Sequence, residues 1–497
     1  MVTGTRRRPV IAIVGGGFTG AAVAANLARN PASDGASIVV FEPRERLGAG
    51  LAYDTDNPAH RINVPAARMS LIPDDSDDFL SWLASKGEPG DDADALAADG
   101  NLYPRRAVFG RYVGEFIAPF LKTGRIAHRR ERVVNIDRHG DHWLLRTGSG
   151  AELLADIVVI ATTHPPPRAP RGVAEMLHGH PRYVPDATVT GALACLRPQD
   201  RVLVIGNGLT AADVIASLRL ANHRGQIVSL SRRGLRSRGH ATTPQEPFGD
   251  FSDDPARTAL ELLRRVRRAV REAAEIGTSW HGVFDALRSQ GGQVWRALPP
   301  AERRRLVRHL RAYWDVHRFR VAPQVDASIR QGLETGQLRV LGGSIDRVET
   351  DGEVIAVDIR HRRNGSSERM LFDACVVTTG PAHTGILSCH DWLADLASQG
   401  WLRLDDVGLG LACDVASRAI AADGRAERSL IIAGPLARGT FGELMGLPQV
   451  NDHAIFVAGE IADMLTPPRK AIGRRPLATA SPVAKRPAPS LVGDTHR

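Results

Sequence analysis

Cysteine is scarce in this chain of 497 residues, which has only four: Cys195, Cys375, Cys389 and Cys413. Their scatter argues against a disulfide framework. The lack of any C-x-x-C pair argues against a zinc site and against a dithiol redox centre. We therefore expect no metal, and a reduced, cytoplasmic compartment fits this cysteine usage best.

Charge is missing from residues 9–28, which follow three arginines and so resemble a signal peptide in hydropathy alone. The glycines of this segment have the spacing of a dinucleotide-binding turn. A strand that is cleaved off or buried in a bilayer could not serve such a turn. We therefore expect neither a targeting segment nor a membrane partner.

The net charge of +9 suggests a nucleic-acid partner only until its distribution is considered. After Thr466 the tail has seven Lys and Arg residues against one Asp, so it supplies +6 of the +9. The remaining charge is ordinary for a soluble globular protein. The composition of this chain, with 24% charged and 43% hydrophobic residues, is also that of a soluble globular protein. We expect no nucleic-acid partner, and a disordered basic tail over residues 466–497.

The chain does contain a complete dinucleotide-binding pattern near its start. The apolar run Val10–Val14 predicts a buried parallel strand. Gly15 permits a sharp turn, Gly17 lets the backbone approach a pyrophosphate, and Gly20 lets the next helix pack closely on the strand. A second apolar run ends at Glu42, whose carboxylate can accept hydrogen bonds from a ribose diol.

The same pattern recurs in the middle of the chain, from a strand at 201–205 to a second strand at 227–230. The strand at 227–230 is followed by Ser231, Arg232 and Arg233, whereas the corresponding strand of the N-terminal unit is followed by Glu42. Because the hydroxyl and guanidinium groups match a 2′-phosphate, the second site should prefer NADPH over NADH. The alternative, a basic surface loop, stays open. The residues predicted to bind NADPH are Gly206, Gly208, Leu209, Thr210, Ser231, Arg232 and Arg233.

A helical segment interrupts the second nucleotide-binding unit. Asp254 and Pro255 suit an N-cap and the first position of a helix. A further helix is expected from Ala301 to Trp314, with arginines between its apolar positions. The chain then returns to predicted strands at 338–341, 345–349 and 354–360, and ends in a helix from about Val450 to Leu465.

These patterns predict an α/β protein with two Rossmann-like dinucleotide-binding domains. The first comprises residues 8–190 and 375–465, because the C-terminal segment returns to it. The second comprises residues 198–374, with a helical insert at about 250–335. The stretch Pro165–Pro198 is interpreted as a linker.

The chain resembles flavoproteins with two dinucleotide-binding domains, a group that includes flavin-containing monooxygenases, ornithine N-hydroxylases and pyridine-nucleotide disulfide reductases. Within this group it is most similar to a bacterial FAD/NAD(P)-binding family that includes a flavin-dependent urate hydroxylase. The resemblance extends from about Arg8 to Leu465. The blocks that carry it are Gly48–Tyr53, Asn63–Ala66, Tyr103–Gly110 and Trp314–Arg318.

The resemblance implies FAD at the first glycine-rich turn and NAD(P)H at the second, with residues 447–450 near the isoalloxazine. Two positions depart from the group: Thr163 stands where a glycine is common, and Pro435 stands where an aspartate is common. The residues predicted to bind FAD are Gly15, Gly17, Phe18, Thr19, Gly20, Glu42, Gly50, Asn63, Val133, Gly434 and Leu447.

The implied function is that of an FAD-dependent, NAD(P)H-using oxidoreductase, with a monooxygenase of a small organic substrate as the preferred hypothesis. Oxygen would be the second substrate. A reductase or oxidase without oxygen insertion stays open. A flavin-binding redox sensor or scaffold without turnover stays open as well. The sequence does not indicate the substrate or the oligomeric state.

Candidate acid–base residues lie after the helical insert, where His317 and Arg318 stand beside Asp315 and Arg320. The arginines could bind an anionic or polar substrate, and the imidazole could move a proton. The alternative is a basic cluster that only satisfies carbonyls at the end of a helix. His240 is a further candidate of similar standing.

Overall fold

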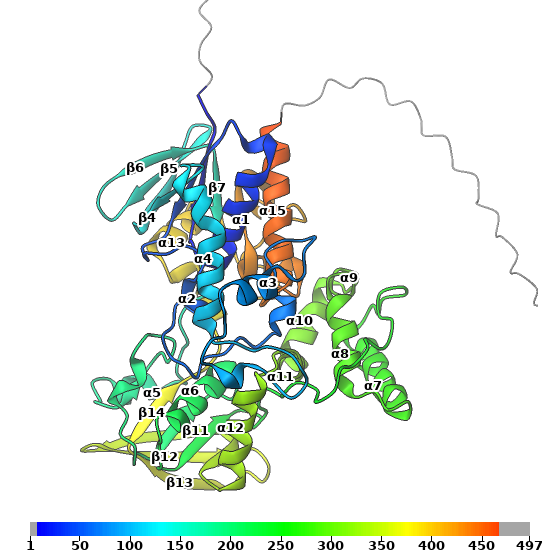
Figure 1. Ribbon diagram of the computed structural model, residues 1–497. Helices are drawn as coiled ribbons and strands as arrows, with labels where there is room; N and C mark the ends of the chain where they lie inside the picture. The colour runs from blue at the N-terminus through cyan, green and yellow to red at the C-terminus, as the bar shows by residue number, and fades with distance from the viewer. Residues whose placement is uncertain (1–6, 467–497) are drawn as a thin grey trace, which may run out of the picture.

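The computed structural model describes residues 7–466, so the predicted basic tail lies outside it apart from Thr466. Figure 1 shows one α/β unit above another, with a lobe of helices projecting beside their junction. Each unit is built on its own sheet, one of six strands and one of seven. The predicted α/β fold with two Rossmann-like units is therefore confirmed.

The first sheet has the strand order β15-β16-β7-β1-β2-β3, and all its neighbours except β15 and β16 run parallel. Side chains of β1 alternate between two hydrophobic cores, because successive residues of a strand point to opposite faces. Ile11 and Ile13 enter one core, and Ala12 and Val14 enter the other. The strands are β1 (Val10–Val14), β2 (Ser37–Phe41), β3 (Ile126–Arg129), β7 (Ile157–Ile160), β15 (Arg418–Ile420) and β16 (Ala426–Ile432).

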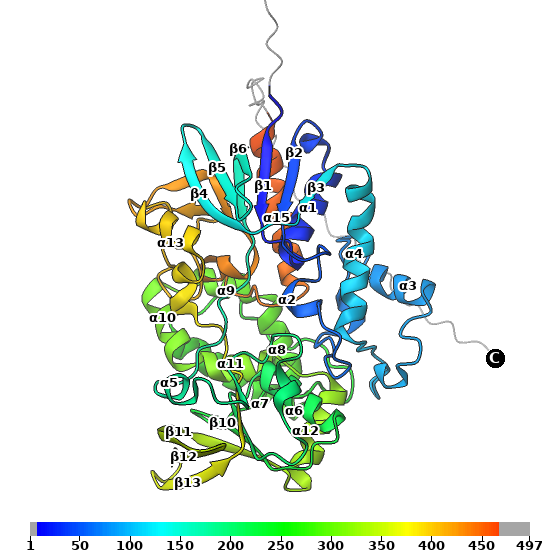
Figure 2. The same ribbon diagram turned by 90° about the vertical axis from the view of Figure 1, so that its left-hand side faces the viewer.

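Different layers cover the two faces of this sheet. The helices α1 and α15 lie side by side on one face, next to α4, as Figures 1 and 2 both show. A small antiparallel sheet, β4-β5-β6, covers the other face with α13. These elements are α1 (Phe18–Arg29), α2 (Gly50–Tyr53), α3 (Asp78–Ser85), α4 (Arg106–Lys122), β4 (Val133–His139), β5 (His142–Thr147), β6 (Glu152–Ala155), α13 (Asp391–Ser398), α14 (Arg438–Phe441) and α15 (Gln449–Leu465).

The second sheet has the order β13-β12-β11-β10-β9-β14-β8. Its strands β8, β14, β9, β10 and β11 are parallel, and β11 continues into an antiparallel meander with β12 and β13. The elements are α5 (Val173–Leu177), β8 (Tyr183–Val184), β9 (Val202–Ile205), α6 (Leu209–Leu220), β10 (Ile227–Ser231), α12 (Pro323–Glu334), β11 (Leu338–Asp351), β12 (Val354–His361), β13 (Ser367–Phe372) and β14 (Ala374–Val377).

The domain limits predicted from the sequence differ from the strand pairing at both crossings. Strands β8 and β14 fall in the first domain by those limits, yet both pair in the second sheet. The stretch Pro165–Pro198 is also more than a linker, since it contains α5 and β8. Its strand was missed because it has only two residues. The two connections between the domains run side by side, bridged at Pro167 and Pro381.

Five helices form the projecting lobe: α7 (Ala259–Glu275), α8 (Trp280–Ser289), α9 (Gly291–Ala297), α10 (Pro300–His309) and α11 (Arg311–Arg318). The helix expected at Asp254 and Pro255 begins later, because the hydroxyl of Thr258 accepts the N–H of Glu261 at 3.1 Å and caps α7. The single helix expected over 301–314 is divided at Leu310 into α10 and α11. The two strands expected at 338–341 and 345–349 are one strand, β11.

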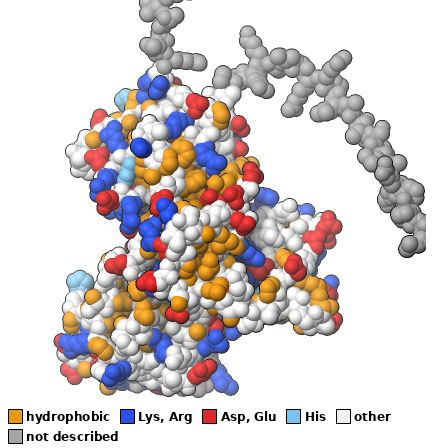
Figure 3. Space-filling view, in the orientation of Figure 1, with side chains coloured by type: hydrophobic (Ala, Val, Ile, Leu, Met, Phe, Trp, Pro, Cys, Tyr) orange, Lys and Arg blue, Asp and Glu red, His pale blue; other side chains and the backbone are white. Residues whose placement is uncertain are grey.

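Among the helices of residues 7–466, none has the length and apolarity that a bilayer crossing requires. In the same residues no three His, Cys, Asp or Glu side chains gather as metal ligands would. On the face in Figure 3, Lys and Arg side chains are interspersed with Asp and Glu.

Candidate active site

The first glycine-rich turn is tight because backbone atoms occupy the space beside two of its glycines. A Cβ on Gly15, whose φ is +101°, would lie 2.6 Å from the carbonyl oxygen of Ala161. A Cβ on Gly20 would lie 1.9 Å from the carbonyl oxygen of Gly15. Both positions therefore exclude a side chain, and α1 begins directly behind the end of β1.

Two further glycine loops converge on the start of α1. Gly50, with φ of +52°, lies so close that a Cβ there would be 2.9 Å from the Cα of Gly17. Gly434, with φ of +68°, lies beside Thr19, whose hydroxyl oxygen would be 2.6 Å from a Cβ. The N-terminal amides of α1 are thus surrounded by backbone, which suits a bound diphosphate.

A buried histidine that the sequence did not single out holds the Gly434 loop. The backbone N–H of Gly434 donates to Nδ1 of His453 at 3.1 Å, and the Nε2 of His453 lies 3.0 Å from the hydroxyl of Ser417. Since Nδ1 accepts, the proton of the ring is on Nε2 and points to Ser417. Burial lowers the pKa of His453 to about 4, so the imidazole is neutral.

Glu42 ends β2 with a carboxylate that is only 4% exposed. One of its oxygens accepts the N–H of Gly16 at 3.1 Å, and the other accepts the N–H of Arg44 at 3.0 Å. The acid thereby connects the second strand to the glycine turn. Its remaining lone pairs face a cavity, where a ribose hydroxyl would be an additional donor.

A cavity of about 1080 Å³ extends from Glu42 past the glycine turn to Leu447. This volume suits an extended cofactor, and the cradle is not filled by side chains of the chain itself. The residues therefore fit FAD. Of the predicted FAD residues, those lining the cavity are Gly15, Gly17, Phe18, Thr19, Glu42, Gly50, Val133 and Leu447. Gly20 and Gly434 lie behind this lining, where Gly20 packs against Gly15 and Gly434 packs against Thr19.

The second glycine-rich turn repeats the geometry of the first. Gly206 has φ of +127°, and a Cβ there would lie 2.5 Å from the carbonyl oxygen of Thr378. The side chain of Asn207 donates to the hydroxyl of Ser231 at 3.0 Å, so the turn is tied to the end of β10. Gly208 has open space around its Cα, as a phosphate would require.

The two arginines after β10 have different surroundings. Arg233 donates to the carbonyl oxygen of His309 at 3.2 Å, and its guanidinium lies 5.1 Å from the ring centre of Tyr313. Arg232 is exposed and makes no hydrogen bond or ion pair with any of residues 7–466. Arg232 is therefore the one of the two that is available to a phosphate.

A second cavity, of about 650 Å³, lies where the two domains and the helical lobe meet. Leu209 and Thr210 of the second glycine turn line it, and it shares Leu447 with the first cavity. A molecule in it would therefore contact both nucleotide sites. The predicted FAD residue Asn63 lines this cavity instead of the first, and its side-chain oxygen accepts the N–H of Ala322 at 3.1 Å.

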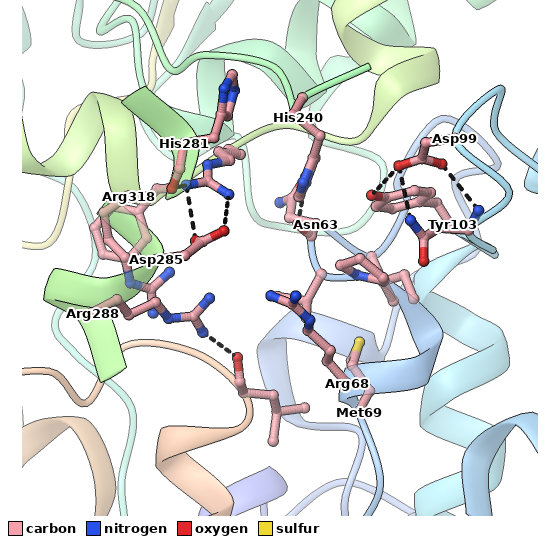
Figure 4. A pocket seen from close by; sticks show the side chains of 18 of the residues that line it. Asn63, Arg68, Met69, Asp99, Tyr103, His240, His281, Asp285, Arg288 and Arg318 are labelled. Carbon is pink, nitrogen blue, oxygen red and sulfur yellow. Dashed lines mark hydrogen bonds and ion pairs between the residues drawn. The ribbon is translucent and has the colours of Figure 1, made fainter. Parts of the chain in front are cut away.

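Two arginines face each other across this second cavity, as Figure 4 shows. Arg288 donates to the carbonyl oxygen of Leu447 and to the side chain of Gln449, both at 2.7 Å, while its Nε has no partner in residues 7–466. Burial lowers the pKa of Arg288 to about 9, which still leaves it charged at neutral pH. Arg68 forms no ion pair with the described residues. An anion would satisfy both.

Carboxylates balance the other arginines of the cavity. Arg320 pairs with Asp285 at 2.9 Å, and Arg318 donates from Nε to Glu443 at 2.6 Å. Arg318 was predicted as a catalytic residue, and it does line the cavity, but this buried pair occupies it. Its role in the structure is to bring Glu443 against α11.

His240 reaches the cavity from the second domain. Its Nε2 lies 3.0 Å from the carbonyl oxygen of Asn63, so this nitrogen carries the proton and Nδ1 is an acceptor. Burial and the neighbouring Arg320 lower the pKa of His240 to about 4. Its ring lies 5.2 Å from that of Tyr103, whose hydroxyl is close to Asp99. His240 is thus a neutral group that can accept a hydrogen bond from a ligand.

The structure places His317 outside this cavity, although the sequence predicted a catalytic role for it. Its ring stacks on Phe284 with centroids 4.8 Å apart, and its Nδ1 lies 2.7 Å from the carbonyl oxygen of Tyr313. Consecutive residues of a helix point about 100° apart, so Arg318 faces the cavity while His317 faces the lobe. Sequence adjacency alone could not decide which of these two residues faces the cavity.

Comparisons with known proteins agree with this geometry. Residues 12–165 match a family described as FAD-NAD(P)-binding, which confirms the predicted resemblance and its cofactor class for this segment. An L-aspartate N-monooxygenase (nitrosuccinate-forming) from Streptomyces davaonensis is 29% identical over 259 residues, covering 43% of this chain and 39% of that protein. The chain thus aligns with about two fifths of the length of this curated relative.

Solved structures match along almost the whole chain. The ornithine hydroxylase of Pseudomonas aeruginosa has a TM-score of 0.60 at 17% identity, covering 92% of this chain and 100% of that one. The FAD-bound cadaverine monooxygenase of Erwinia amylovora has a TM-score of 0.60 at 12% identity, covering 95% and 99%. At these identities the likeness shows the fold alone, which has two dinucleotide-binding domains.

Proposed function

We propose that this chain is an FAD-dependent, NADPH-using monooxygenase of a small molecule that carries both a carboxylate and an amine. One observation carries the proposal: the cavity that joins the two nucleotide sites has Arg68 and Arg288 facing each other across it. Arginine recognises carboxylates with paired hydrogen bonds, so an anion fits between them. The relatives that act on aspartate, ornithine and cadaverine all have amines as substrates, which supports N-hydroxylation.

Bound FAD would supply the redox chemistry, by accepting a hydride from NADPH and then activating oxygen. The chain's own residues would bind and orient the reactants. Glu42 would accept ribose hydroxyls, the first turn of α1 would hold the diphosphate, and Leu447 would border the isoalloxazine. Arg68 and Arg288 would fix the carboxylate of the substrate.

His240 would orient the amine end of the substrate. Its Nδ1 is an acceptor, so a neutral amine could donate one hydrogen to it while the nitrogen lone pair remains available. An amine that attacks an activated oxygen must be unprotonated, and a neutral imidazole leaves it so.

The experiment is a substrate screen with purified, flavin-loaded protein. NADPH oxidation, hydrogen peroxide and hydroxylated product would be measured together, with L-aspartate, other amino acids and simple dicarboxylates as candidate substrates. We expect one amino acid to stimulate NADPH oxidation and to yield about one product per NADPH, with little peroxide. Peroxide in place of product would indicate an oxidase. No NADPH consumption by flavin-loaded protein would indicate a sensor.

A further inference from the structure

A third cavity, of about 730 Å³, lies inside the helical lobe and is separate from the two nucleotide sites. Its walls are mostly apolar, with five charged side chains and one histidine among them, and come from all five helices of the lobe. The apolar residues are Leu262, Leu263, Val266, Val270, Trp280, Phe284, Leu287, Val294, Trp295, Leu298, Leu306, Val307, Leu310, Tyr313 and Trp314. Its volume is in the range of small-molecule sites, roughly 300–1000 Å³.

Helix α8 is the wall between this apolar cavity and the polar cavity of the proposed active site. Its residues divide with the period of a helix, since positions three or four apart share a face. One face, with Trp280, Phe284 and Leu287, lines the apolar cavity. The other face, with His281, Asp285 and Arg288, lines the polar cavity. The apolar cavity is therefore a distinct compartment.

One end of the apolar cavity is closed by a buried guanidinium group. Arg438 is 4% exposed and lines the cavity. Its Nε donates to the carbonyl oxygen of Gly442 at 3.3 Å, and its Nη2 lies 3.8 Å from Asp315. Its Nη1 has no hydrogen-bond partner anywhere in residues 7–466. A buried charged donor without an acceptor is unfavourable, so a ligand that supplies an acceptor would be favoured.

The charges around this end favour an anion over a neutral acceptor. Arg311 donates to Asp315 at 3.2 Å, and Arg318 pairs with Glu443. Of the charged side chains that line the cavity itself, four are arginines (Arg267, Arg271, Arg311 and Arg438) and one is a carboxylate (Glu443), so positive charge is in excess. An anionic group is therefore favoured there over a neutral one.

We propose that this cavity binds an amphipathic carboxylate, with its hydrocarbon chain along the apolar walls and its carboxylate at the guanidinium group of Arg438. The proposal goes beyond the proposed monooxygenase function and does not depend on it. It uses the apolar face of α8 and the unpartnered guanidinium, and no residue of either glycine turn.

The test uses dodecanoate as probe and the full-length, flavin-loaded protein. Trp280, Trp295 and Trp314 line the cavity, so their fluorescence reports binding, and calorimetry gives the stoichiometry. We expect saturable binding of one dodecanoate per chain. Dodecyltrimethylammonium has a similar chain and the opposite charge. We expect it to bind at least about 10-fold more weakly than dodecanoate. Absent or unsaturable binding of dodecanoate would overturn the proposal, and so would equal binding of the cation.

Three variants locate the probe. Arg438→Gln should weaken dodecanoate binding about 10-fold or more and leave 1-dodecanol unchanged. Arg267→Gln is the matched control, because this arginine lines the cavity from α7 and should have no effect. If Arg438→Gln does not fold, Val266→Trp still decides the question, since a filled cavity should abolish binding while NADPH oxidation persists. Binding that survives Val266→Trp, or that depends on Arg267 alone, would overturn the proposal. A dimer in sedimentation that Val266→Trp dissolves would do so too, since a second chain would then cover the cavity.

Discussion

Replacing Arg232 should change the choice between NADPH and NADH, while replacing Arg233 should not. The two arginines are adjacent in sequence, and the pattern after β10 gives them the same predicted role. In the structure Arg232 is exposed and lacks a partner in the described chain, whereas Arg233 is held by the carbonyl oxygen of His309 and the ring of Tyr313. We therefore expect Arg232→Gln to remove the main contact with the 2′-phosphate.

The size of the effect follows from the bond that is lost. A hydrogen bond to a charged group contributes about 1.5–3 kcal/mol, which corresponds to about a 10- to 150-fold change in kcat/KM for NADPH. NADH lacks the phosphate, so its kcat/KM should stay within a factor of about two or three. Initial rates of flavin reduction under anaerobic conditions, with each nucleotide, measure both values without a substrate.

Arg233→Gln is the matched control. It removes the same charge one residue away but also the contact with His309, so the helical lobe should dock less firmly and the free energy of unfolding should fall. Its NADPH to NADH ratio should stay close to that of the original chain. An unchanged ratio in Arg232→Gln would refute the reasoning, as would a larger change in Arg233→Gln.

Three further predictions concern other parts of the site. Glu42→Ala should raise the Kd for FAD about 10-fold or more in spectroscopic titration, because the N–H of Gly16 and the ribose hydroxyls both lose their acceptor. Glu42→Gln keeps one acceptor oxygen, so it should bind FAD more tightly than Glu42→Ala. Arg68→Gln should leave urea unfolding within about 0.5 kcal/mol, since this side chain has no partner in residues 7–466, yet raise the KM for the substrate about 10-fold. Burial lowers the pKa of His453 to about 4 from 6.5, so the unfolded chain binds this proton first as the pH falls. The free energy of unfolding should therefore decrease from pH 6.5 to 4, and His453→Gln should make that decrease shallower.

Those parts of the fold that depend on local backbone chemistry could be predicted from the sequence. Positions 15 and 206 require glycine because each has a positive φ and because a carbonyl oxygen would lie less than 3 Å from a Cβ there. Both requirements belong to the strand–turn–helix unit itself. The apolar runs before each turn are short and continuous, as buried parallel strands are. Two Rossmann-like units follow from these features alone.

The composition of the cavity proposed for the substrate could be predicted only in part, because its residues come from distant segments. Arg68 ends a short 3-10 helix (Ala66–Arg68) of the first domain, His240 lies in the second domain, and Arg288 lies on α8 of the lobe. His240 was named from the sequence as a candidate, whereas Arg68 and Arg288 belong to no motif, and arginine is common throughout the lobe. The local argument that joined His317 to Arg318 stays a prediction for catalysis. In the structure only Arg318 of the two lines this cavity, because α11 separates neighbouring side chains by about 100°.

The helical lobe therefore has a different part in function from the two glycine turns. The turns are constrained by backbone contacts that tolerate no side chain, so they can vary little without losing the nucleotide. The lobe meets the first domain through side chains: Arg288 donates to the carbonyl oxygen of Leu447, Trp295 donates to that of Gly439, and Arg318 pairs with Glu443. Leu447 borders both the cofactor cavity and the substrate cavity. A change in how α8 docks would alter the space beside a bound flavin without disturbing either glycine-rich turn. We therefore expect the lobe to determine substrate choice.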